Sequence, residues 1–73
     1  MEIYKDVDGD SGISAYEIGE DRVSIRLISG AIYVYTFASA GREHIENMKK
    51  LAKGGDGLNS YIKRNKVPYV AKL

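Results

Sequence analysis

Apolar and polar residues alternate in the first half of the chain. In the run 22–28, Val23, Ile25 and Leu27 alternate with charged or polar neighbours, which is typical of a strand with one buried face. The next run, 31–37, is rich in β-branched and aromatic residues, which favour strands. Ser29-Gly30 separates the runs. A two-residue turn ending in glycine favours a β-hairpin, because glycine adopts positive φ at little cost.

Two shorter segments extend this hairpin. Residues 13–18 read as an earlier strand, joined to the hairpin through a turn at 19–21. The three runs predict an antiparallel β-meander of three strands, and residues 3–7 are the candidate for a fourth strand.

The periodicity changes to that of a helix after Phe37. Apolar residues recur three and four positions apart, and Ser39 is the expected N-cap of a first helix that Gly54-Gly55 ends. Asp56 is the expected cap of a second helix, and Pro68 ends any continuation. The apolar positions of the two helices are Ile45, Met48, Leu51 and Ala52, then Leu58, Tyr61 and Ile62. The predicted fold class is therefore α+β, a three- or four-stranded antiparallel meander followed by two short helices.

The order of these motifs resembles that of the KTSC domain family. A strand carries Tyr33-Val34-Tyr35, an amphipathic helix follows, and Lys53-Gly54 leads after a short gap to Leu58-Asn59-x-x-Ile62. The resemblance is strongest over residues 11–69. The chain departs from the family in lacking a Gly-Tyr near the end of the first strand, and in the enlarged turn at 54–57. KTSC domains occur at the C-terminus of some lysyl-tRNA synthetases and as small bacterial proteins, so the resemblance implies this α+β fold and, through the synthetase, a role with RNA.

A two-residue turn at Ser29-Gly30 would fix the register of the hairpin. Leu27 would then face Ile32, and Arg26 would face Tyr33. One face would be aliphatic and covered by the helices, with Val23, Ile25, Leu27, Ile32 and Val34. The other would present Arg22, Arg26, Tyr33, Tyr35 and Phe37. Exposed aromatics beside arginines suit stacking on unpaired bases, although cross-strand Arg–Tyr pairs also stabilise sheets without any ligand.

Positive charge is concentrated in the second half of the chain. Residues 1–37 carry a net charge of −4 and residues 38–73 a net charge of +5. The basic residues of the two helices are Arg42, Lys49, Lys50 and Lys53, then Lys63, Arg64 and Lys66. Candidate phosphate contacts among them are Lys49, Lys50, Lys53, Lys63 and Arg64. The glycine-rich turn 54–57 would let backbone amides approach an anion. The alternative is a solvated helix face, since Glu46 precedes Lys50 by four residues, the spacing of an ordinary surface pair.

The segment from Asp6 to Glu17 matches an EF-hand loop at several ligand positions. Asp6, Asp8 and Asp10 stand at the first, third and fifth, and Glu17 at the twelfth. Ser11 replaces the turn glycine, and too few residues precede the loop for an entering helix. We therefore expect an Asp- and Gly-rich turn that leads into a strand, with no metal site.

Composition excludes several further classes. The 73 residues suffice for one domain, which spans 1–73. There is no cysteine, and the single histidine, His44, is predicted to be a partly buried structural residue. No nucleophile or acid–base pair is recognisable, so the chain is predicted to be non-enzymatic and without a cofactor. No apolar run is long enough for a membrane helix, and no signal peptide is recognisable, which predicts a cytoplasmic protein without membrane contact.

The function that best accounts for these features is a small binding module. It would bind RNA or another anionic ligand through the aromatic and arginine-bearing sheet face, with the helix lysines at its rim. The alternative is a protein-interaction or self-association domain that uses the same aromatic face.

Overall fold

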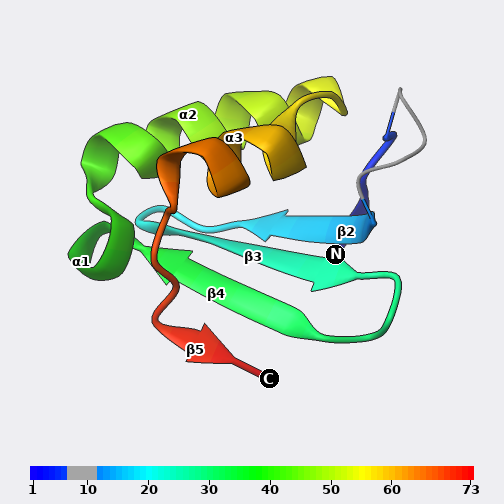
Figure 1. The fold of residues 1–73 in the computed structure, drawn as a ribbon, viewed down its shortest axis with the longest axis horizontal. Coiled ribbons are helices and arrows are strands. Elements are labelled where there is room, and N and C mark those ends of the chain that lie inside the picture. Colours follow the sequence, from blue (N-terminus) through cyan, green and yellow to red (C-terminus); the bar gives the residue numbers. More distant parts are fainter. Residues whose placement is uncertain (7–11) are drawn as a thin grey trace.

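The computed structural model describes residues 1–6 and 12–73. An antiparallel sheet lies under a layer of helices (Figure 1). The strands are β1 (Glu2–Ile3), β2 (Ile13–Ile18), β3 (Arg22–Leu27), β4 (Ile32–Thr36) and β5 (Ala71–Lys72). The helices are α1 (Phe37–Ala40), α2 (Arg42–Gly54) and α3 (Leu58–Asn65). The predicted α+β fold class is confirmed, and the sheet gains two short edge strands.

The five strands lie in the order of the chain, β1-β2-β3-β4-β5, and every neighbouring pair is antiparallel. Of the predicted fourth strand at 3–7, Val7 lies outside the described residues, and within them the strand is β1 at Glu2–Ile3. β5 was not predicted at all. It returns the chain from the end of α3 to the free edge of β4 (Figure 1).

The β3–β4 hairpin has a register one residue away from the prediction. Val23 pairs with Tyr35 and Ile25 with Tyr33, because the loop holds three residues, Ile28, Ser29 and Gly30. The N–H of Leu27 donates to the carbonyl of Ala31 at 2.8 Å, and Gly30 has a φ of +99°. A three-residue loop with glycine in the left-handed region is a common hairpin connection. A slip of one residue turns every β4 side chain to the opposite face.

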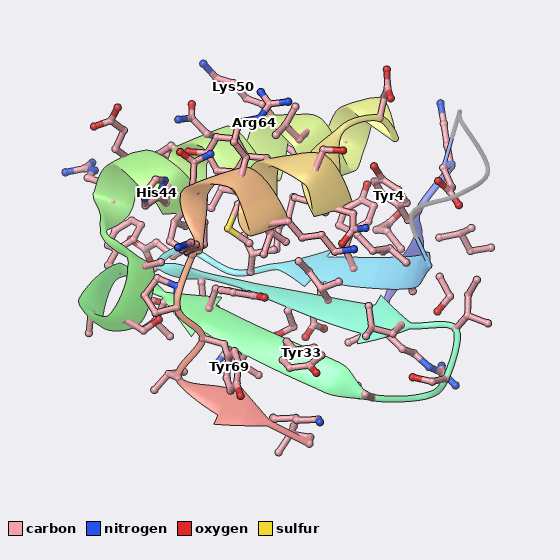
Figure 2. The ribbon with its side chains drawn as sticks, in the orientation of Figure 1. Tyr4, Tyr33, His44, Lys50, Arg64 and Tyr69 are labelled. Carbon is pink, nitrogen blue, oxygen red and sulfur yellow. The ribbon has the colours of Figure 1, made fainter. Side chains whose placement is uncertain are left out.

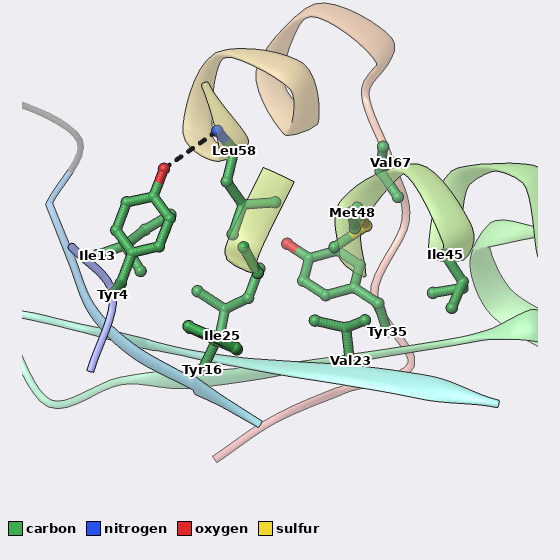
Figure 3. Close-up of a cluster of buried hydrophobic side chains, with 11 residues drawn as sticks. Tyr4, Ile13, Tyr16, Val23, Ile25, Tyr35, Ile45, Met48, Leu58 and Val67 are labelled. Atoms are coloured by element: carbon green, nitrogen blue, oxygen red, sulfur yellow. Dashed lines mark hydrogen bonds between the residues drawn. The ribbon is translucent and has the colours of Figure 1, made fainter. Parts of the chain in front are cut away.

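The core lies between the sheet and the two longer helices (Figure 3). Val23 and Ile25 from β3 are buried there, as predicted. Ile45, Met48 and Leu58 are also buried, again as predicted, and Leu51 and Ile62 pack against them as partly buried residues. Ile32 and Val34 were expected in this core. They lie on the other face of the sheet because of the register shift, and Tyr35 is buried in their place with 5% of its surface exposed.

The helix caps differ from those predicted. Thr36 rather than Ser39 is the N-cap after β4, and Ser39 is the third residue of α1, where the two side chains form a reciprocal capping box. Gly41 then separates α1 from α2. Gly55 ends α2 with a φ of +69°, as expected of the glycine pair. The N-cap of α3 is Gly57, not Asp56, and it has no side chain to accept the first amides.

Candidate functional site

The predicted aromatic platform does not lie on the open side of the sheet. Tyr33 and Tyr35 point to the side that the helices cover, since they pair with Ile25 and Val23, which are buried there. Phe37, expected beside them, is the first residue of α1. The reason is the three-residue loop, which sends the aromatic residues of β4 inward and its aliphatic residues outward. This part of the sequence-based site was wrong.

Arg22 and Arg26 do lie on the uncovered side, as predicted, but their neighbours are aliphatic. Arg26 pairs with Ile32 and Arg22 with Thr36, while Val34 lies between these pairs. Both arginines are exposed. Arginines and tyrosines therefore lie on opposite sides of the sheet, and one ligand strand cannot contact both sets as the sequence suggested.

The structure instead places a tyrosine cluster where the C-terminal segment crosses the helix-covered side of β4. The ring centroids of Tyr33 and Tyr69 are 4.9 Å apart, and those of Tyr35 and Tyr69 are 6.3 Å apart, both edge-on. Tyr69 is 49% exposed and Tyr33 is half-buried, whereas Tyr35 belongs to the core. Figure 2 shows Tyr33 and Tyr69 side by side above β4 and β5. Two tyrosine rings therefore remain partly accessible at this edge.

Burial changes the chemistry of the innermost tyrosine. The pKa of the Tyr35 hydroxyl is raised above its ordinary value of 10.0, first by desolvation and then by the nearby hydroxyls of Tyr33 and Tyr69. Tyr35 therefore packs in the core as an uncharged ring at physiological pH.

One cation lies against this cluster. The Nζ atom of Lys72 lies 5.5 Å from the centroid of the Tyr33 ring, a cation–π distance. Lys63, Arg64 and Lys66, earlier in the C-terminal segment, are all exposed, and Arg64 lies on the outer side of the helices, away from the tyrosines (Figure 2). No acidic residue occurs from Gly57 to Leu73. In the described part of the chain none of these four cations forms an ion pair. We call the following set the C-terminal strip: Tyr33, Lys66, Tyr69 and Lys72.

Sequence reasoning found only part of this strip. Lys66 was recognised with Lys63 and Arg64 as a basic residue of the second helix, whereas Tyr69 and Lys72 were missed. They lie in a segment without strong periodicity, and only the return of the chain to β4 brings Tyr69 onto Tyr33. The available signal was compositional, four basic residues with no acidic one after Gly57.

The three predicted basic residues of α2 lie in three different environments. Lys49 is largely engaged: its Nζ lies 3.1 Å from a carboxylate oxygen of Glu46 and donates to the carbonyl of Glu20 at 2.8 Å. Lys53 lines a hollow of about 520 Å³ on the flank of the sheet, beside the acidic residues Glu2 and Glu17. Lys50 alone points outward with Arg64 of α3, at the top of Figure 2. Of the three predicted lysines of α2, only Lys50 therefore adds a cation to the outer side of the helices.

The groove between α2 and α3 contains a hydrogen-bonded network. The Nδ2 atom of Asn47 donates to the Tyr61 hydroxyl at 3.1 Å, and that hydroxyl lies 2.7 Å from Nδ1 of His44. Asn65 donates its side-chain amide to the carbonyl of Tyr61 at 3.0 Å. The bonds from α2 to the Tyr61 hydroxyl tie the two helices together. His44 is half-buried, as predicted, and its Nδ1 atom is engaged by Tyr61.

The glycine-rich turn at 54–57 has one amide engaged by the end of α2. The N–H of Gly55 donates to the carbonyls of Leu51 and Ala52. The N–H of Leu58, directly after the turn, donates to the Tyr4 hydroxyl at 3.3 Å. Gly55 is itself buried against Lys5. The turn was expected to present its amides to an anion, and those of Gly55 and Leu58 are instead used within the fold.

The acidic motif falls partly outside the described residues, which include Asp6 and Glu17 but not Asp8 or Asp10. Its second half is strand β2, as expected, and Glu17 pairs with Ser24 in the sheet. In the part of the chain that the structure describes, no group of three or more potential ligand residues is close enough to hold a metal ion. None of the described helices has the length and apolar character needed to span a bilayer.

Comparison of the chain with protein-family models, with curated proteins and with solved structures yields no match. The candidate function therefore rests on the geometry of these surfaces.

Proposed function

We propose that this chain is a non-enzymatic binding module that takes single-stranded RNA, or a similar polyanion, on the C-terminal strip. The observation that carries the proposal is Tyr69, 49% exposed, against Tyr33, with the Lys72 Nζ atom 5.5 Å from the Tyr33 ring. Bases stack on accessible aromatic rings without regard to sequence, and cations beside them contact the phosphates. The strip supplies both kinds of group.

Charge supports the same surface. The stretch from Gly57 to Leu73 has four basic residues and no acidic one. Lys50 and Arg64 form a separate positive area on the outer side of the helices, away from Tyr33 and Tyr69 (Figure 2). A field of one sign attracts polyanions and speeds their association. Lys49 and Lys53, by contrast, lie beside acidic groups and contribute less.

Membership of the KTSC family and a cytoplasmic location belong to the same proposal. The motif residues Tyr35 and Leu58 are buried, so the resemblance concerns packing of the fold more than a binding surface. The non-enzymatic assignment draws support from the site itself. His44 has Nδ1 engaged by Tyr61, and the sequence places no nucleophile beside it.

The test is the binding of a fluorescently labelled 12-nucleotide oligouridylate, measured by anisotropy over a range of salt concentrations. Lys66→Ala with Lys72→Ala should lower the magnitude of the salt slope by about 1.4, since each lost phosphate contact on a single strand contributes about 0.7. Tyr69→Leu should weaken binding roughly 5- to 150-fold, the equivalent of ~1–3 kcal/mol for one stacked base, with the slope unchanged.

The matched control is Arg22→Ala with Arg26→Ala, which removes the same number of charges from the opposite side of the sheet. We expect it to leave the affinity nearly unchanged. The proposal fails if the parent protein does not bind the oligonucleotide, or if the two double variants lose affinity equally.

A further inference from the structure

The side of the sheet opposite the helices carries a second surface, separate from the C-terminal strip. In the described part of the chain no helix lies over it (Figure 1). One cross-strand row runs from Ile3 through Ala15 and Arg26 to Ile32. Beyond it, Leu73 exchanges two backbone hydrogen bonds with Ile32. We call this surface the open face: Ile3, Ala15, Glu17, Arg22, Ser24, Arg26, Ile32, Val34 and Leu73.

Exposed aliphatic side chains lie at the two sides of the open face. Ile3 on β1 is 81% exposed and Leu73 beyond β5 is 75% exposed, whereas Ala15 and Ser24 between them are small and nearly covered. A hollow of about 530 Å³ opens on the β1 side, with Ile3, Ala15 and Arg26 among its lining residues. The exposed charged residues of this face, Glu17, Arg22 and Arg26, lie on β2 and β3 between the aliphatic residues of β1 and β4.

The spacing between the aliphatic residues of β1 and β4 suits a helix. Strands β1 and β4 are three sheet positions apart, about 14 Å at the usual strand spacing. An α-helix with its side chains is about 10 Å across. A helix lying along the strands would therefore contact Ile3 on one side and Ile32 and Val34 on the other. Large exposed aliphatic side chains around a polar rim are typical of interaction surfaces.

The charges on the open face select the partner. Arg22 and Arg26 lie at the two ends of the central strand β3, about 13 Å apart along it, and neither forms an ion pair within the described chain. Glu17 is the acidic residue on the strand beside them. A complementary helix carries two carboxylates on its apolar side. Residues seven apart lie on one side of a helix and about 10.5 Å apart, within reach of two long arginine side chains.

A second copy of the chain fits this face poorly. Two sheets that pack face to face keep their strands nearly aligned. A twofold axis over the centre of β3 then places Arg26 opposite either Arg26 or Arg22 of the other copy. Like charges in contact across an interface cost several kcal/mol. The charge pattern therefore favours an acidic partner over a dimer whose axis passes over β3.

We propose that the open face is a docking surface for an acidic amphipathic helix, whose apolar side contacts the aliphatic residues of β1 and β4 and whose carboxylates pair with Arg22 and Arg26. This function is additional to polyanion binding and uses the opposite side of the sheet. Either can fail without the other.

The experiment uses two synthetic 15-residue amphipathic helices with the same leucine-rich side. One carries two glutamates seven residues apart on the edge of that side, and the other carries lysines there. Binding is followed by chemical-shift changes in the parent protein and by calorimetry. We expect the glutamate peptide to bind with shifts confined to β2, β3 and β4, and the lysine peptide to bind at least about tenfold more weakly.

Charge reversal gives the decisive variant. Arg22→Glu with Arg26→Glu should invert the preference, so that the lysine peptide binds better than the glutamate peptide. Ile3→Ser should weaken both peptides, because Ile3 is exposed and contributes contact rather than stability to the free protein. Lys66→Ala with Lys72→Ala is the matched control on the other side of the sheet and should change nothing. Thermal unfolding of each variant verifies that it is folded.

Several outcomes would overturn the proposal: no binding of the glutamate peptide to the parent, equal binding of both peptides, or no inversion in the charge-reversed variant. A dimer in sedimentation that Ile3→Ser dissociates would assign the open face to a second copy. Oligouridylate binding that the arginine variant abolishes would assign it to nucleic acid. Either result rejects the helix as the occupant.

Discussion

The hydroxyl of Tyr4 accepts a hydrogen bond from the backbone N–H of Leu58 at 3.3 Å, between residues 54 positions apart in the chain (Figure 3). Leu58 is the first residue of α3, and the preceding Gly57 has no side chain that could cap the helix. The tyrosine supplies this cap from the N-terminal segment, with its ring 4% exposed and edge-on to Tyr16. One side chain thus joins the sheet edge, the core and the second long helix.

Tyr4→Phe tests this cap. The ring and its packing remain, but the buried amide of Leu58 loses its acceptor. We expect a loss of about 1 kcal/mol in the free energy of unfolding, measured by urea denaturation. Tyr69→Phe is the control, since its ring is half exposed and should change stability by less than about 0.5 kcal/mol. Equal stability of the parent and Tyr4→Phe would mean that the Leu58 amide has no need of the hydroxyl.

The glycine pair at the end of α2 allows a second comparison. Gly55 has a φ of +69°, and a Cβ atom there would approach Lys5 Cβ to 2.5 Å. Gly55→Ala should therefore lower stability by at least ~1–2 kcal/mol, the usual cost of the left-handed region for a residue with a side chain. At Gly54, inside the helix, a Cβ would meet nothing within 4 Å. Gly54→Ala should raise stability by roughly 0.5–1 kcal/mol. Thermal denaturation of the two variants would show whether each gains or loses stability relative to the parent. A similar loss of stability at both positions would contradict this geometry.

Two isoleucines on neighbouring strands test the register of the hairpin. Ile25 is 2% exposed beneath the helices, whereas Ile32 lies on the open face. Ile25→Ala should cost ~2–5 kcal/mol, as expected for a large-to-small change in a core, and Ile32→Ala less than about 1 kcal/mol. Denaturant unfolding measures both. With a two-residue turn, both isoleucines would be buried. Large and equal losses of stability in the two variants would therefore contradict the three-residue loop and support the two-residue turn.

Alkaline titration tests the burial of Tyr35. Its pKa is raised in the folded protein by desolvation and by Tyr33 and Tyr69. The unfolded chain therefore releases this proton first, at about pH 10, and the folded state holds more protons above that pH. The resulting contribution to stability is fully present below about pH 10 and is lost as the pH rises through the folded pKa. The free energy of unfolding of Tyr35→Phe should fall less steeply than that of the parent between about pH 9.5 and 11.5. Chemical denaturation at each pH measures this free energy. A parallel decline would show that Tyr35 titrates alike in both states.

The sequence by itself determined the fold class and most of the core. Val23, Ile25, Ile45, Met48 and Leu58 could be assigned because their spacing repeats every two residues in a strand or every three to four in a helix. Those periods are local properties of the chain. They place a buried side whenever an element is long enough to show several repeats.

Only the tertiary structure decided which side of β4 faces the core, and with it the nature of both candidate surfaces. Ser29-Gly30 is compatible with a loop of two or of three residues, and the choice depends on which β4 side chains fill the space under the helices. Burying Tyr35 rather than Val34 removes more apolar surface from water in so small a core. Tyr4 and Tyr69 lie beside two-residue edge strands without periodicity. Their partners are distant in the sequence, and such contacts form only when the whole chain is folded.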